Sequence, residues 1–159
     1  MRQKTTIDAS TRAAFLELFE LFRSSIGLHE LQLDESDSSY TVRLGNDEVQ
    51  TADITIEPTA EGEVLLYSSL DRLPNGLTPE IVLLIDTVNA NKENMFFLSA
   101  SEHHLFLCSS APITEVTATR LVEWVKWFYE QVLEWRNYRK LLPEAQTQPP
   151  PISTGKLTV

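Results

Sequence analysis

Hydrophobic residues recur along the chain with two different periods, one typical of helices and one typical of strands. The first run covers residues 10–26, where Phe15, Phe19 and Phe22 fall on one face at helical spacing. Gly27 follows the run, and glycine is the residue that most often ends a helix. The pattern therefore predicts an amphipathic helix over residues 10–26.

The same segment carries apolar side chains outside that stripe. Leu16 and Leu21 do not share the face of the phenylalanines, so the helix is apolar over more than one side. Either the domain itself buries both sides, or one side is left for a binding partner. The periodicity leaves these two interpretations open.

A change to alternating apolar and polar residues then predicts three strands. The alternation covers residues 40–44 and 50–56, whereas residues 64–70 are apolar enough on both faces to lie centrally in a sheet. Turn-forming residues separate the three segments at 45–47 and 58–62. Short turns between alternating strands predict an antiparallel meander with one face on the core.

A second helix is predicted to begin at Thr78, which is a suitable N-cap, with Pro79 at the first helical position. Residues 81–85 are consecutive and apolar, and Val88 follows. Five such residues in a row surround most of a helix, so this helix must be covered on most of its sides. A core contact on one flank and a subunit interface on the other would achieve this.

Two more strands, at residues 95–100 and 105–109, lead to a long helix over residues 113–142. Pro143 ends that helix, and residues 143–159 contain three consecutive prolines without periodicity, which predicts a disordered tail.

These segments together predict an α+β fold built on an antiparallel sheet, with the order α-β-β-β-α-β-β-α. We expect a flexible N-terminus over residues 1–9 and a single domain over residues 10–142. A chain of 159 residues with 42% hydrophobic residues can build one core of ordinary size.

Charge narrows the classes of partner. The formal net charge is −10, and such a domain repels phosphate backbones, which argues against direct nucleic-acid binding. Ten carboxylates fall between residues 28 and 63, opposed only by Arg43. They are either ordinary solvent-facing charges or a field that repels wrong partners and attracts a basic one.

The number of cysteines and the length of the apolar stretches indicate the cellular compartment. Cys108 is the single cysteine, so no internal disulfide is possible and a reducing environment fits. Glu17 and Glu20 interrupt the first apolar run, which argues against a signal peptide, and no apolar stretch is long enough for a bilayer. We expect a cytoplasmic protein that does not bind membranes.

Candidate chemistry is sparse. His104 and Cys108 share a strand face, but four residues separate them by about 13 Å along a strand, too far for a hydrogen bond. His103 and His104 are adjacent and point to different sides. Metal-ligand spacings and glycine-rich phosphate loops are absent from the sequence. We expect no catalytic, metal or cofactor site; a small enzyme that brings two carboxylates together in space is the least favoured hypothesis.

The order of elements and several local phrases resemble the class I chaperones of bacterial type III secretion, the Tir-chaperone family. The similarity covers residues 10–142 and departs from the family in a glycine-poor last hairpin and in the added tail. The segments that carry it are residues 19–28, 31–35, 81–91, 97–107 and 124–142.

The resemblance implies a homodimer joined through the second helix and a client, the N-terminal segment of an exported effector, bound in extended form without catalysis or cofactor. The implied dimer interface comprises Ile81, Leu84, Ile85 and Val88. The candidate client-binding residues are Leu16, Phe19, Leu31, Leu33, Val42 and Leu44, each of which could instead be ordinary core. The alternative function is a non-catalytic adaptor or regulator of the same fold, unrelated to secretion.

Overall fold

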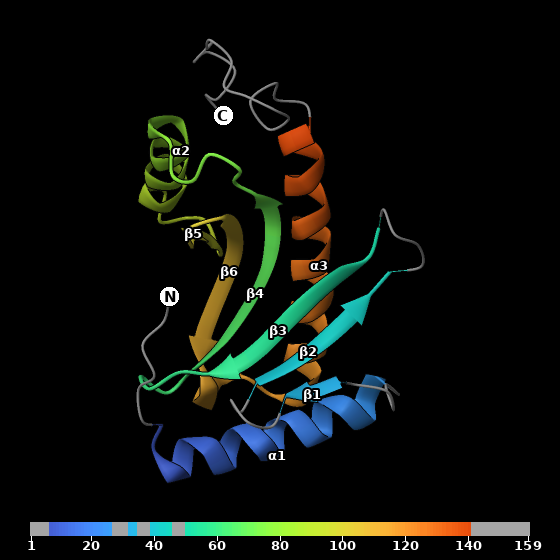
Figure 1. The fold of residues 1–159 in the computed structure, drawn as a ribbon. Coiled ribbons are helices and arrows are strands. Elements are labelled where there is room, and N and C mark those ends of the chain that lie inside the picture. The colour runs from blue at the N-terminus through green and yellow to red at the C-terminus, as the bar shows by residue number, and fades with distance from the viewer. Residues whose placement is uncertain (1–6, 27–31, 35–38, 46–49, 141–159) are drawn as a thin grey trace.

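The computed structural model describes residues 7–26, 32–34, 39–45 and 50–140 (Figure 1). The first six residues and the predicted tail from residue 143 lie outside this part of the chain, as does the candidate client-binding residue Leu31.

The predicted α+β class and the antiparallel sheet are confirmed. In chain order the elements are α1 (Ala9–Ile26), β1 (Gln32–Asp34), β2 (Ser39–Leu44), β3 (Ala52–Pro58), β4 (Glu63–Arg72), α2 (Pro79–Ala90), β5 (Phe97–Ala100), β6 (His104–Pro112), the 3₁₀ turn η2 (Ile113–Glu115) and α3 (Ala118–Lys140).

The sheet has six strands in the order β1-β2-β3-β4-β6-β5, and every neighbouring pair is antiparallel. The three-residue strand β1 was not predicted, because so short a segment shows too little alternation to be recognised. It pairs with β2 and forms one outer edge of the described sheet, while β5 forms the other.

One face of the sheet is buried under α1 and α3. Val42, Ile54, Leu66 and Leu107 project from four strands into this layer and are fully buried. In Figure 1, α3 runs along the sheet and α1 crosses one end of it, while α2 lies near the opposite end. The helical residues that complete the core include Phe15, Phe19, Phe22, Leu121, Val125, Phe128 and Val132.

The predicted start of the second helix is confirmed, whereas that of the last helix is not. Thr78 accepts a hydrogen bond from the Ile81 amide at 3.3 Å and Pro79 opens α2, as predicted. The predicted start of the last helix at residue 113 is wrong. Residues 113–115 form the 3₁₀ turn, and α3 begins only after Thr117, whose hydroxyl accepts from the Arg120 amide at 3.2 Å.

Candidate protein-binding surface

The candidate client-binding residues whose side chains the structure describes do not share one exposed surface. Leu16 is 40% exposed on α1. Phe19 and Val42 are buried, with exposed fractions of 2% and 0%. Leu44 is half-buried at the end of β2, and Leu33 lies in the edge strand β1. Leu16 is therefore the member of the set whose described side chain is most open to a partner.

A cluster of aromatic rings seats α1 on the sheet. The rings of Phe19 and Tyr40 stack, and Phe15 packs against the same tyrosine with ring centroids 5.7 Å apart. Because these rings fill the space between α1 and β2, the phenylalanine stripe belongs to the core. Leu21, which is 55% exposed, joins Leu16 as an apolar residue of α1 that the core leaves uncovered.

The predicted dimer residues of α2 lie mostly in the protein's own core. Ile81, Leu84 and Val88 are buried, and Ile85 is half-buried. The large hydrophobic residues that α2 exposes are Val82 and Leu83. The sequence could not assign these roles, because five consecutive apolar residues contain every face of a helix.

Exposed large hydrophobic side chains of the described chain gather in two regions. One is α1, and the other, here called the α2–β5 region, contains Leu77, Val82, Leu83, Met95 and Phe97. The two regions lie toward opposite ends of the molecule (Figure 1). A partner bound at α1 and a partner bound at α2 would therefore occupy separate places.

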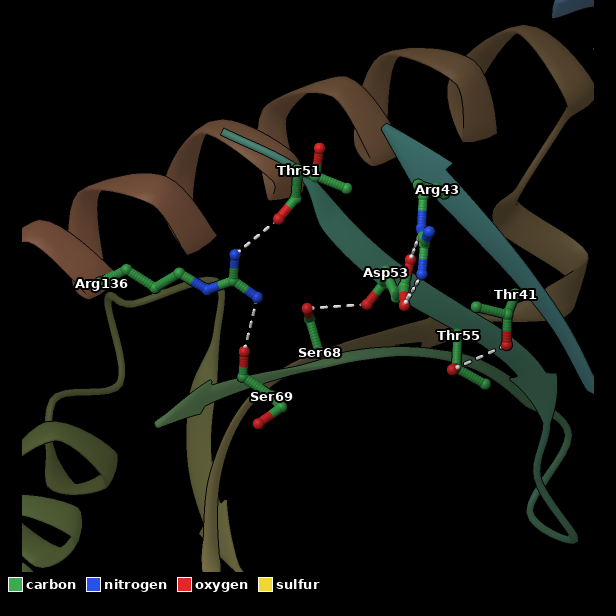
Figure 2. Close-up of polar contacts among 8 residues, drawn as sticks. All are labelled: Thr41, Arg43, Thr51, Asp53, Thr55, Ser68, Ser69 and Arg136. Carbon is green, nitrogen blue, oxygen red and sulfur yellow. Dashed lines mark hydrogen bonds and ion pairs between the residues drawn. The ribbon is translucent and has the colours of Figure 1, made fainter. Parts of the chain in front are cut away.

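Polar pairs occupy the sheet face opposite the helices (Figure 2). The Arg43 guanidinium binds the Asp53 carboxylate through two hydrogen bonds of 2.7 and 3.1 Å, and Thr41 and Thr55 are linked across the same strands at 3.2 Å. The hydrogen bond from Arg43 holds the pKa of Asp53 below its ordinary value. Arg43, the only lysine or arginine between residues 28 and 63, is thus already paired with a carboxylate of the same stretch.

The strands β3 and β4 separate at one end, and Arg136 bridges the opening. Their pairing runs from Pro58 to Thr55 on β3, and beyond it Arg136 of α3 donates to the carbonyls of Thr51 at 2.8 Å and Ser69 at 3.0 Å (Figure 2). Burial lowers the pKa of Arg136. An arginine in a helix carries no sequence signal for such a contact, so this role could not be predicted.

The candidate chemical residues do not assemble into a reactive site. His103 lies in the turn before β6, beside Glu102, and His104 packs against Phe106 on β6. Cys108 is buried in the same strand. Among the residues that the structure describes, no three His, Cys, Asp or Glu side chains gather where they could hold a metal ion.

Within the same part of the chain, no helix has the length and apolar character needed to cross a bilayer.

Comparisons by sequence find no relatives: no protein-family model matches the chain, and no curated protein sequence matches it. Comparisons of structure do. The SchA chaperone–HopA1 effector complex matches with a TM-score of 0.63 and 18% identity, over 83% of this chain and 99% of that one.

Two further solved structures show how widely the fold is shared. The Yersinia pestis type III secretion chaperone SycH, solved with a fragment of YscM2, matches with a TM-score of 0.53 and 18% identity over 75% of this chain and 97% of its own. YbjN from E. coli, described as a putative transcription regulator, matches with a TM-score of 0.54 and 14% identity over 79% of this chain and 91% of its own. The chain has the α+β fold found in type III secretion chaperones.

Proposed function

We propose that the protein is a non-catalytic bacterial chaperone, which binds the N-terminal segment of an exported type III effector in the cytoplasm and holds it competent for secretion. The observation that carries the proposal is the likeness of nearly the whole fold to a chaperone solved with its effector, at a TM-score of 0.63. Holding a client requires no nucleotide, metal or other cofactor, and the proposal assigns none.

The exposed side chains of α1 and the outer strand β1 are suited to binding an extended segment. Leu16 and Leu21 provide exposed apolar side chains on α1, and β1 is an outer strand whose backbone can pair with an added strand. A segment that orders on binding loses conformational entropy, so the contact must be long and must combine apolar side chains with backbone hydrogen bonds. The net charge of −10 favours a client segment that is basic rather than acidic.

The proposal includes a homodimer through α2. Val82 and Leu83 are 42% and 56% exposed on the helix, and Leu77 before it is 52% exposed. Contact with a second copy would cover these side chains, together with the open side of Ile85. In this arrangement Ile81, Leu84 and Val88 support the helix from within the protomer, and the exposed residues meet the partner.

The test is affinity capture of the tagged full chain from its own organism, with the bound proteins identified by mass spectrometry. The expected result is one exported protein, which is no longer captured when its N-terminal segment is deleted. Deleting an equally long segment elsewhere in that protein is the matched control. Capture that survives loss of the N-terminal segment, or capture of no exported protein, would contradict the proposal.

The second candidate function is a regulatory adaptor, because YbjN, described as a putative transcription regulator, shares the fold at a TM-score of 0.54. Under this alternative the same capture recovers a protein that is not exported.

A further inference from the structure

The outer strand β5 is bonded by a side chain at the place where a neighbouring strand would lie. The Leu98 amide donates to Oδ1 of Asn89 at 2.7 Å, and Nδ2 of Asn89 donates to the Leu98 carbonyl at 2.9 Å. Both backbone groups of one residue are thus satisfied by one primary amide. A primary amide offers the same donor and acceptor as a peptide group, so Asn89 reproduces the pairing of a strand residue.

The register shows that these bonds lie on the outer side of the strand. β5 pairs with β6 through Phe97↔Cys108, Leu98↔Leu107 and the two pairs that follow. In an antiparallel ladder, successive residues turn their backbone groups to opposite sides. Because Leu98 bonds to Asn89 of α2, its groups point away from β6.

The outer side of β5 is short, so one residue can close it. Alternation places the outward backbone groups of Phe97–Ala100 on Leu98 and Ala100, and Ala100 is followed at once by the turn in which Ser101 donates to the His104 carbonyl. Asn89 occupies the interior one of the two positions. A new strand would keep too few hydrogen bonds to pair stably there.

The C-terminal end of α2 is held in the position from which the Asn89 side-chain amide reaches the backbone of Leu98. Val88 is buried, and its carbonyl accepts from the Asn91 amide at 3.2 Å and from Nδ2 of Asn94 at 3.1 Å. The next residue along the helix is Asn89. Asparagine suits the position because aspartate cannot donate to the Leu98 carbonyl and alanine can make neither bond.

We propose that Asn89 blocks strand addition at β5, so that a second copy of this chain cannot pair by its backbone at that edge of the described sheet. Unprotected edge strands pair with other chains, and folded proteins commonly cover or plug them. The inference goes beyond the proposed function, because it concerns the backbone of β5 itself and not the client.

The test compares Asn89→Ala with the wild type and with Asn91→Ala, a matched control at the same helix end whose Oδ1 bonds the Glu93 amide and not β5. Amide hydrogen exchange and sedimentation equilibrium are measured on each full chain. We expect the Leu98 amide of Asn89→Ala to exchange about tenfold faster, as loss of one hydrogen bond implies. We also expect that variant alone to form species larger than the wild type as concentration rises.

Two results would overturn the proposal: unchanged exchange at Leu98, or faster exchange without any larger species. Asn89→Ser replaces the alanine variant if circular dichroism shows that the latter is unfolded, and unfolding of both would make Asn89 a folding residue instead. None of these readouts requires a client. Failure here is therefore distinguishable from failure of the chaperone proposal, which rests on affinity capture by the wild type.

Discussion

Phe19 of α1 lies flat against Tyr40 of β2, with ring centroids 3.7 Å apart and 13° between the ring planes. Phe19 is only 2% exposed, and Phe22 packs beside it with centroids 5.6 Å apart. The stack joins the first helix to the sheet, and it gives a residue predicted to hold a client a structural contact inside the protomer.

Replacing Phe19 with alanine should therefore lower the free energy of unfolding by about 3–5 kcal/mol, because the substitution leaves a cavity in the core. Urea denaturation followed by circular dichroism measures the change. Leu16→Ala is the control and should cost less than about 1 kcal/mol, since that side chain is 40% exposed. A Phe19→Ala protein that kept full stability but lost its client would instead make Phe19 a client contact.

Leu16→Asp should weaken client binding at least tenfold without changing the melting temperature appreciably. The substitution places a charge where the proposed client would bury an apolar side chain, while the folded protomer leaves that position open to water. Calorimetric titration with the captured client segment measures the affinity. Ser24→Asp adds the same charge at another exposed position of α1 and should have the smaller effect. Equal effects of the two variants would show that only net charge matters.

Leu83→Asp should convert the dimer into folded monomers. The side chain is 56% exposed in the protomer, so the charge need not enter the core, but it would be buried against the second copy. Light scattering after size-exclusion chromatography measures the mass. Leu21→Asp is the matched control, because that leucine is 55% exposed on α1, and its dimer should persist. A Leu83→Asp protein that remained dimeric would place the interface elsewhere.

The ion pair on the open sheet face should make a small contribution to acid sensitivity. Arg43 holds the pKa of Asp53 below its ordinary value, so the folded state favours the charged carboxylate. The resulting stabilisation is present above the ordinary carboxyl pKa and is lost as the pH falls through the lowered pKa. Both side chains are largely exposed to water, which screens their attraction, so we expect only a small contribution to the free energy of unfolding.

Urea titrations at pH 7 and near pH 3 measure this contribution as the difference between the wild type and Asp53→Asn. The gap between the two proteins should narrow toward the lower pH. A gap that stayed constant with pH would show that Asp53 stabilises the fold by packing and not by charge.

The sequence predicted the elements whose signals are local. Thr78 and Pro79 indicated the start of α2, and alternation indicated the long strands, because a cap and an alternating pattern are both formed by residues close together in the sequence. The start of α3 was predicted too early, since the apolar residues at 113 and 116 continue the helical pattern into a 3₁₀ turn. Hydrophobicity alone did not show where that turn interrupts the helix.

The binding surfaces were harder to predict, because they are what remains after the core has formed. Val82 and Leu83 differ in no local property from Ile81 and Leu84, and only the packing of α2 decides which pair faces outward. Asn89 lies in the segment 81–91 that carries the resemblance, but its side chain bonds to Leu98, nine residues away on β5. Contacts of this kind depend on the assembled tertiary structure.

The separation of β3 and β4 has a mechanical consequence. Four residue pairs join these strands, from Thr55↔Tyr67 to Pro58↔Val64, whereas β4 and β6 remain paired from Glu63↔Pro112 to Arg72↔His104. The β3–β4 line is therefore less extensively paired than the β4–β6 line, and Arg136 links the two strands across its open end (Figure 2). Bending along that line would tilt β1, β2 and β3 as one panel against β4, β6 and β5, with the paired ladders inside each panel kept intact.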